Sequence, residues 1–390
     1  MMKVYSGIDI FEKVLPKKFY GLRAGVLIHP ASVNRKLVYT KDVFLKSKKI
    51  QIKAFFGPQH GIFGDTQDNM IEWEGFIDKT TGLPVYSLYG KTRKPTEQML
   101  EGIEVFIIDL QDVGARYYTY IWTMALCMEA CERKISLIVL DRVNPIGGHI
   151  VEGPVLKSEF SSFVGLYPLP IRHGMTIGEI AMYFKSRFYP EVDLTVIPLR
   201  GWRRNQWFDS TGLPWVMPSP NMPTLETATV YPGMCLLEGT ILSEGRGTTR
   251  PFEIFGAPFI EPERLVRRLN DFKLKGVFFR PLYFSPTFNK FAGKLCGGAQ
   301  IHVIDREKFK PFKTAIAILL AIKELYPEIN LWRQPPYEYE FEKLPFDILA
   351  GSDRVRKDIE EGKSLKDMES WWNEEVQMFE QIRKQYLLYD

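Results

Sequence analysis

The chain has 390 residues, of which 45% are hydrophobic and 25% are charged, and its formal net charge is +4. A chain of this length is expected to form about two domains, with cores large enough to need no disulfide or metal ion for stability. The near balance of 51 basic and 47 acidic residues gives no electrostatic reason to expect nucleic acid or an anionic membrane as a partner.

The four cysteines contain no C-x-x-C pair, and Cys127 and Cys131 lie one helical turn apart in an apolar stretch. This spacing predicts buried thiols. The N-terminus lacks the apolar region of a signal peptide, and the longest apolar run, residues 315–322, is too short to span a bilayer. We therefore expect a cytoplasmic protein without a membrane partner.

The first 150 residues repeat a short apolar run, a turn and a helical stretch. The runs lie at residues 25–28, 50–56, 85–88, 105–108 and 135–140, and residues 118–134 have the apolar density of a buried helix. Apolar runs without alternation, separated by helices, are typical of parallel strands that are covered on both faces. The prediction for this half of the chain is a doubly wound α/β sheet.

The second half has clearer helix signals. A capping box at Thr176 and Glu179 predicts a helix toward Phe188, and further helices are expected at residues 262–275, 309–326 and 364–386. Residues 202–258 are rich in Gly, Pro, Ser and Thr and show little periodicity, which predicts a long functional loop. We place a boundary near residues 250–260, so that residues 1–255 form the first domain and residues 256–390 a smaller α/β domain.

Polar segments follow four of the predicted strands, at residues 29–34, 57–65, 109–118 and 141–148. Ligands bind beyond the carboxyl ends of the strands in doubly wound sheets, so these segments are expected to border a pocket. The carboxylates available for chemistry lie near strand ends or in the long loop: Asp65, Asp109, Asp112, Asp141, Glu226, Glu238, Glu244 and Glu253. Glycoside hydrolysis needs two such groups, so the residues alone predict a hydrolase or a sugar-binding protein.

Other chemistries lack their motifs. No G-x-G-x-x-G follows the first strand, Val85 stands where a P-loop needs glycine, and no G-x-S-x-G occurs. The five histidines lack zinc-site spacing. We therefore expect no cofactor and no metal. Besides a hydrolase and a sugar-binding protein, a third possibility is a nucleotide-dependent enzyme, which rests on fold analogy alone.

Several long motifs occur in a fixed order: FGPQHG (56–61), DLQDVGARYY (109–118), DRVNPIGG (141–148), PSPNMPTLE (218–226) and EGTILSEGRGTTRPFE (238–253). Two shorter ones, YFSPTF (283–288) and ILAGS (348–352), extend the match to the C-terminal part. With these motifs the chain resembles the bacterial DUF1343 family, whose characterised members are NamZ-type exo-β-N-acetylmuramidases. The resemblance covers nearly the whole chain.

This resemblance implies a Rossmann-like N-terminal domain that holds the active site and an auxiliary C-terminal domain. It also implies release of N-acetylmuramic acid from the non-reducing end of peptidoglycan fragments, so the expected partner is a small saccharide or muropeptide fragment. We predict catalytic or orienting roles for Gln59, His60, Asp65, Asp112 and Glu244. Substrate binding is predicted for Arg116, Tyr118, Asp141, Asn144, Asn221, Glu226, Arg246 and Arg250, and the aromatic residues Tyr117, Trp202, Trp207 and Trp215 are proposed beside the sugar.

One position departs from the family pattern. The family's usual tetrad is Pro-Glu-His-Gly, with the glutamate as leading catalytic candidate, but this chain has Gln59 there. An amide does not titrate, so Gln59 can orient a group but cannot act as general acid or base. Three accounts remain open: another carboxylate (Asp65, Asp112 or Glu244) transfers the proton, the substrate acetamido group supplies the nucleophile, or the protein is a sugar-binding or sensor protein that hydrolyses poorly.

Overall fold

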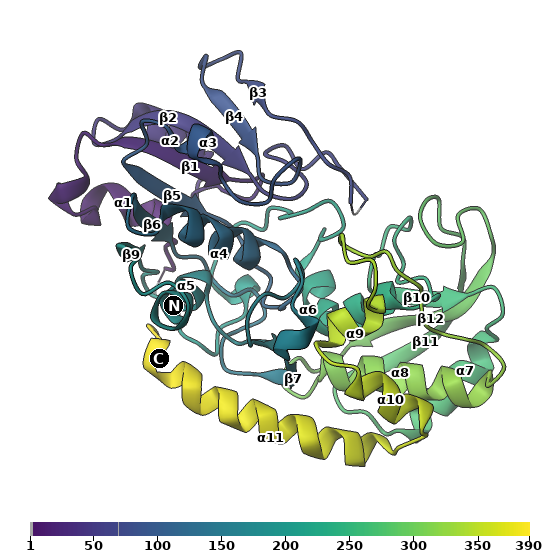
Figure 1. Ribbon diagram of the computed structural model, residues 1–390. Helices are drawn as coiled ribbons and strands as arrows, with labels where there is room; N and C mark the ends of the chain where they lie inside the picture. Colours follow the sequence, from purple (N-terminus) through teal and green to yellow (C-terminus); the bar gives the residue numbers. More distant parts are fainter. Residues whose placement is uncertain (1–2, 69) are drawn as a thin grey trace.

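A seven-stranded sheet organises the first half of the computed structural model, which describes residues 3–68 and 70–390 (Figure 1). The strand order is β3-β4-β2-β1-β5-β6-β9, and only the short pair β3–β4 is antiparallel. The bounds are β1 Arg23–Ile28, β2 Gln51–Gly57, β3 Phe76–Ile77, β4 Pro84–Ser87, β5 Val105–Asp109, β6 Ser136–Leu140 and β9 Leu194–Ile197. The predicted doubly wound sheet is confirmed, and each expected run begins and ends within two residues of its strand.

Helices cover both faces of this sheet, as the doubly wound prediction requires. One layer contains α1 and α2, and the other contains α3, α4 and α5. Successive side chains of β1 pack into the two layers alternately: Val26 packs into the first layer and Leu27 into the second. The bounds are α1 Gly7–Val14, α2 Thr40–Lys46, α3 Glu97–Leu100, α4 Tyr120–Cys131 and α5 Ile177–Arg187, and the capping box at the start of α5 is present.

The segment expected to be one long loop contains a buried helix. Helix α6 (Leu225–Met234) is followed by the 3₁₀ helix η4 (Cys235–Gly239), and every residue of α6 except Glu226 is buried. A helix buried on all sides has no polar face, so it leaves no amphipathic pattern in the sequence. Gly233 within α6 permits close packing, because a Cβ there would lie 1.9 Å from the carbonyl oxygen of Pro311 at the start of α8.

A three-stranded antiparallel sheet, in the order β10-β12-β11, forms the centre of the smaller C-terminal part. The three predicted helices are present here as α7, α8 and α11. Their bounds and those of the remaining elements are β10 Ile254–Ala257, α7 Pro262–Asp271, β11 Val277–Phe284, β12 Cys296–Val303, α8 Pro311–Leu325, α9 Pro345–Ala350, α10 Arg354–Glu360 and α11 Leu365–Arg383. A separate antiparallel pair, β7 (Glu152–Val155) and β8 (Pro170–Arg172), lies between β6 and β9 in sequence.

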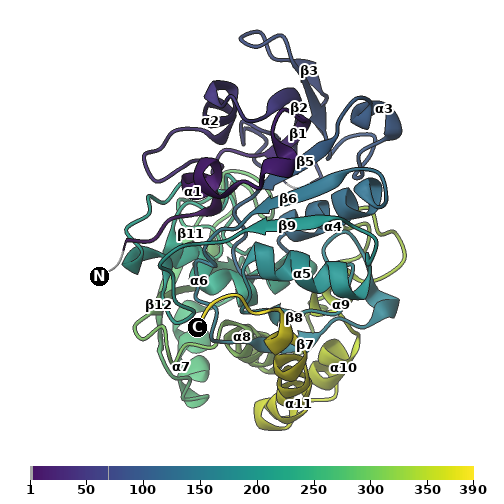
Figure 2. The same ribbon diagram turned by 90° about the vertical axis from the view of Figure 1, so that its left-hand side faces the viewer.

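The last helix returns to the first half of the chain. Figures 1 and 2 show α11 along the lower edge of the molecule, with the chain end beside α5. Glu375 of α11 accepts a hydrogen bond from the Val155 amide at 2.9 Å, and Arg383 donates to the carbonyl oxygens of Gly148 and Gly174. The two parts are therefore held as one unit. Among the described residues, none of the helices is long and apolar enough to cross a membrane.

Candidate active site

A cavity of about 470 Å³, counted with its opening to solvent, lies between the carboxyl ends of β2 and β5 and two segments from the second half of the chain. We call it the inner cavity. The loop after β2 and the segment between β5 and α4 form one side, while η4 and residues 337–338 form part of the other. Its polar lining consists of Gln59, His60, Tyr117, Tyr118, Thr119, Tyr120, Ser219, Asn221, Tyr231, Glu238, Arg246, Tyr337 and Glu338.

Gln59 contacts a carboxylate from the far end of the sequence. Its amide nitrogen donates to the Tyr89 hydroxyl at 3.1 Å and lies 3.4 Å from Oε1 of Glu338. The Tyr89 hydroxyl donates in turn to Oε2 of Glu338 at 2.8 Å. The Thr119 hydroxyl donates to the amide oxygen of Gln59 at 2.7 Å, so the amide nitrogen must face Tyr89 and Glu338. Gln59 cannot supply a carboxyl group itself, but its amide nitrogen orients the carboxyl group of Glu338.

Glu338 has the environment of a general acid. Burial, together with the negative charge of Glu238, raises the pKa of Glu338 to about 7, although hydrogen bonds from Tyr89 and Gln59 act in the opposite direction. Its backbone has a positive φ of 46°, a conformation that is unfavourable for a non-glycine residue and concentrates at functional sites. A buried carboxyl group with this pKa retains its proton in a large fraction of molecules at neutral pH.

Glu238 is tuned in the opposite direction. Burial disfavours its charge, but the Arg246 guanidinium and a hydrogen bond from Tyr337 outweigh burial and lower the pKa of Glu238. Arg246 donates to Oε1 at 2.8 Å and Tyr337 to Oε2 at 2.7 Å. Glu238 is therefore held as a carboxylate. The cavity thus contains two acidic groups that favour opposite protonation states, as the acid and the carboxylate of a glycosidase do.

His60 is neutral in this site. Burial, with a smaller effect from the charge of Arg246, lowers the pKa of His60 to about 4, even though a hydrogen bond to the Thr66 carbonyl oxygen favours the charged form. That bond is 2.7 Å long and involves Nδ1, and a carbonyl oxygen can only accept. Nδ1 therefore carries the proton and Nε2 is an acceptor. His60 has a positive φ of 69°, so the loop after β2 is shaped to present this ring.

Six of the predicted catalytic and substrate-binding residues lie at or beside the inner cavity. Gln59, His60, Tyr118, Asn221 and Arg246 line it directly. Glu244 lines an adjoining cavity, accepts a hydrogen bond from Lys290 at 2.9 Å and lies 3.5 Å from Arg246. Among the residues that the structure describes, no group of three or more His, Cys, Asp or Glu is placed to hold a metal ion.

The other predicted catalytic and substrate-binding residues lie elsewhere, and most of them have structural partners. Asp65 is exposed and lines neither cavity, whereas Asp112 is buried and accepts from the Gly114 amide at 2.7 Å. Asn144 donates to the Met175 carbonyl oxygen at 2.9 Å. Glu226 and Arg250 border a separate cavity beside β12, where Arg250 pairs with Glu253 at 3.1 Å. These five side chains are not brought to the inner cavity.

Arg116 and Asp141 also form structural hydrogen bonds within the fold. The Arg116 guanidinium is fully buried and donates to the carbonyl oxygens of Pro154, Leu169 and Leu349, each at 2.8 Å. Asp141 accepts from the Thr176 hydroxyl and the Gly178 amide, both at 2.8 Å, and from the Tyr389 hydroxyl. Asp141 therefore joins α5 and the chain end to β6.

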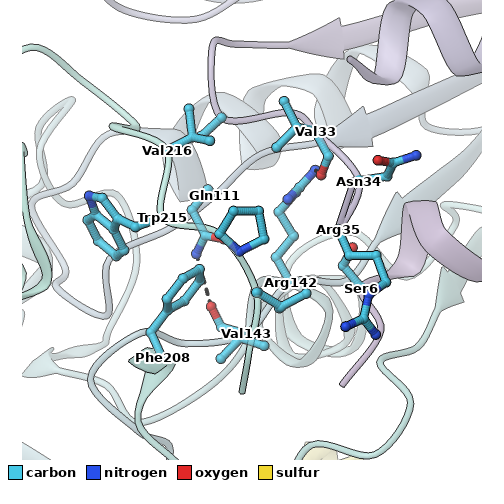
Figure 3. A pocket seen from close by; sticks show the side chains of 13 residues that line it. Ser6, Val33, Asn34, Arg35, Gln111, Arg142, Val143, Phe208, Trp215 and Val216 are labelled. Carbon is cyan, nitrogen blue, oxygen red and sulfur yellow. Dashed lines mark hydrogen bonds between the residues drawn. The ribbon is translucent and has the colours of Figure 1, made fainter. Parts of the chain in front are cut away.

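A second cavity occupies the usual ligand position of a doubly wound sheet, beyond β1, β5 and β6 (Figure 3). None of the described residues that line it is a carboxylate, and its polar groups are committed to the protein. Gln111 donates to the Asp112 and Val143 carbonyl oxygens, and Arg142 pairs with Asp109 at 2.6 Å. The four strand-end loops therefore divide between two cavities, and of these two the inner cavity is the one with described carboxylate side chains on its lining.

The aromatic residues divide in the same way. Tyr117 and Tyr118 line the inner cavity, whereas Trp215 lines the second one (Figure 3). Trp202 packs against Tyr389, and Trp207 lies near the Arg172 and Arg306 guanidinium groups. Of the five aromatic residues proposed from the sequence, Tyr117 and Tyr118 therefore line the inner cavity, together with Tyr120, Tyr231 and Tyr337.

The sequence search missed Glu338 and did not select Glu238 for catalysis. Glu238 was among the carboxylates of the central segment, but nothing in its spacing distinguished it. Glu338 lies in a non-periodic segment between Tyr337 and Tyr339 and after two prolines. An acidic residue flanked by aromatic residues in an irregular segment was the only available signal.

Comparison with known proteins identifies the family. The chain matches the family model described as exo-beta-N-acetylmuramidase NamZ, N-terminal, over residues 24–226, and the corresponding C-terminal model over residues 229–389. It is 47% identical over 389 residues to peptidoglycan beta-N-acetylmuramidase NamZ of Bacillus subtilis (strain 168), which covers 99% of this chain and 92% of that protein.

Solved structures agree with this match. A DUF1343 family protein from Bacteroides fragilis superposes with a TM-score of 0.90 at 33% identity and covers 100% of both chains. A second DUF1343 protein from that organism gives a TM-score of 0.76 at 30% identity and covers 100% of this chain and 99% of its own. The chain therefore belongs to the DUF1343 family, the family of the exo-β-N-acetylmuramidase NamZ.

Proposed function

We propose that this protein is a glycosidase that releases N-acetylmuramic acid from the non-reducing end of peptidoglycan fragments. The family and the full-length similarity to a peptidoglycan beta-N-acetylmuramidase support this activity. Its substrate is then a small saccharide or muropeptide fragment. The observation that carries the proposal is the pair of buried acidic groups, Glu338 and Glu238, on one cavity with opposite protonation preferences.

Glu338 is the proton donor in this proposal. Its carboxyl group gives a proton to the glycosidic oxygen as the bond between that oxygen and the anomeric carbon breaks. A water molecule then bonds to the anomeric carbon and loses a proton, which completes the hydrolysis. Tyr89 and Gln59 hold the carboxyl group in place, and burial of the Tyr89 hydroxyl keeps its pKa far above neutral, so that Tyr89 remains a hydrogen-bond donor.

Glu238 provides the negative charge. Positive charge develops on the sugar ring as the bond breaks, and an ionised carboxylate fixed beside it stabilises that charge. Arg246 and Tyr337 each occupy one oxygen of Glu238, which prevents rotation of the group. Neutral His60 and Asn221 line the same cavity and are suited to hydrogen bonds with sugar hydroxyl or acetamido groups.

The sensor alternative rested on Gln59, and Glu338 removes its main support. A carboxyl group lies within hydrogen-bonding distance of the amide, so the cavity does not lack a titratable acid. A cytoplasmic location also remains a proposal, supported by four cysteines that are all buried free thiols.

The test compares 4-nitrophenyl β-N-acetylmuramide with the corresponding β-N-acetylglucosaminide. We expect the wild-type protein to hydrolyse the first and to discriminate against the second. Binding of the muramide without turnover, together with activity gained in Gln59→Glu, would instead establish a sugar-binding protein.

A further inference from the structure

The inner cavity adjoins a larger, more open one. This outer cavity measures about 1090 Å³ with its opening to solvent and shares Glu238, Arg246 and Tyr337 with the inner cavity. Its other charged lining residues are Asp68, Glu244, Lys290 and Arg333. The two cavities therefore adjoin at these three side chains, and Glu238 lines both of them.

Two of the three cations in the outer cavity are held by the protein. Arg246 bonds to Glu238 and lies beside Glu244, and Lys290 bonds to Glu244 at 2.9 Å. Lys290 also donates to the carbonyl oxygens of Leu237 and Leu242 at 2.7 and 2.8 Å. These two acids and two bases form a buried network, and drawing either cation toward a ligand would leave a buried carboxylate poorly compensated.

Arg333 differs from both. Within residues 3–68 and 70–390, its guanidinium has no carboxylate within ion-pair distance, and it is half-buried at the wall of the outer cavity. The guanidinium carbon lies 5.6 Å from the centre of the Tyr337 ring. The Arg333 amide donates to the Gly239 carbonyl oxygen at 3.1 Å, which ties this segment to η4, the element that contains Glu238. A positive charge is thus held on the wall of the outer cavity, which Glu238 also lines.

N-acetylmuramic acid differs from N-acetylglucosamine by one substituent, a lactyl ether that ends in a carboxylate. A guanidinium with unused donors is the natural receptor for such a group, because it can donate two parallel hydrogen bonds. We infer that Arg333 binds the lactyl carboxylate and sets the preference for the muramoyl sugar, an inference that rests on the proposed function. The lactyl group occupies the outer cavity while the sugar ring stays in the inner one.

The test uses Arg333→Gln, which removes the charge, and Arg333→Lys, which retains it. Arg264→Gln is the matched control, because Arg264 lies on α7 with its guanidinium carbon 5.5 Å from the ring centre of Tyr326, and it lines neither cavity. Three 4-nitrophenyl glycosides serve as substrates: the β-N-acetylmuramide, its lactyl amide and the β-N-acetylglucosaminide.

We expect Arg333→Gln to lower kcat/KM for the muramide on the order of 10- to 100-fold, mainly through KM, since a hydrogen-bonded ion pair to substrate is lost. The values for the amide and the glucosaminide should change less than about threefold. Arg333→Lys should restore part of the loss, and Arg264→Gln should match wild type. An equal fall on all three substrates, or no change on the muramide, would overturn the inference.

Calorimetric binding of free N-acetylmuramic acid separates this inference from the proposed activity. If the wild-type protein hydrolysed none of the glycosides, the proposed function would fail. Weaker binding of this sugar by Arg333→Gln, with N-acetylglucosamine binding unchanged, would then still support Arg333 as the carboxylate receptor. Equal binding of the acidic sugar by both proteins would refute it.

Discussion

Replacing Glu338 by glutamine removes a titratable proton while keeping the size and planarity of the side chain. Tyr89 can still donate to an oxygen at this position, so the cavity should keep its shape. Loss of a general acid typically costs a factor of about 10² to 10⁴ in rate, or roughly 3–5 kcal/mol of barrier. We expect kcat for an alkyl or sugar leaving group to fall by this amount, because such a group cannot depart without a proton.

The leaving group and the pH separate acid catalysis from simple damage. 2,4-Dinitrophenolate departs without protonation, so Glu338→Gln should slow the dinitrophenyl glycoside far less than the natural disaccharide. With a pKa of about 7, the protonated fraction of Glu338 falls about tenfold between pH 6 and pH 8. Wild-type kcat/KM on the disaccharide should fall in parallel, and the variant should lose this dependence. Equal losses on both substrates, or an unchanged alkaline limb in the variant, would refute the assignment.

Stability provides an independent check of the same group. The folded-state pKa of Glu338 lies above the unfolded value of about 4.3, so its stabilising contribution is complete below that value and is lost as pH rises toward 7. The glutamine variant should therefore gain free energy of unfolding relative to wild type between pH 5 and pH 8. Urea unfolding at the two pH values measures this difference, and a gap that stays constant would show that Glu338 does not titrate in this range.

Three further changes probe the site and its support. Gln59→Glu would place a second carboxyl group beside Glu338, at the place where the amide nitrogen lies 3.4 Å from Oε1. Because two such groups share one proton, the alkaline limb of kcat/KM should move to higher pH. An alkaline limb at the wild-type pH would contradict the contact. Arg116→Met leaves three buried carbonyl oxygens without their donor and should cost about 3–5 kcal/mol in urea unfolding. Its KM should stay within twofold of wild type, because Arg116 does not line the inner cavity. A larger rise in KM would show that Arg116 contacts the substrate. Gly233→Ala forces a methyl group against Pro311 and should lower the melting temperature by several degrees in calorimetry, whereas wild-type stability would show that α6 and α8 can separate there.

The sequence predicted the first sheet well because its strands are buried on both faces. Runs such as residues 105–108 contain only apolar side chains, and helices separate them at regular intervals, so period and composition agree. Helix α6 was invisible for the opposite reason. It is buried on every side and contains Pro232 and Gly233, which normally indicate a break. Its position depends on packing against α8, a tertiary contact that local sequence does not contain.

Only one side of the candidate site could be predicted from the sequence. Motif and strand-end position both indicated the loop after β2 and the segment after β5, and Gln59, His60 and Tyr118 do line the inner cavity. Glu338 lies 279 positions from Gln59 in a segment without periodic structure. Which carboxylates meet across a cavity is a question of distance between two parts of the fold, and sequence spacing does not report it.

The glutamine at position 59 becomes understandable once Glu338 is placed beside it. Two carboxyl groups at this separation would titrate as a pair, with one proton shared between them and two apparent pKa values. An amide avoids this coupling, and the Thr119 hydroxyl fixes its orientation so that its nitrogen donates toward Glu338. A single acid then titrates near neutrality, with Glu238 held ionised by Arg246. The departure from the family tetrad therefore changes how the proton is held and does not leave the cavity without an acid.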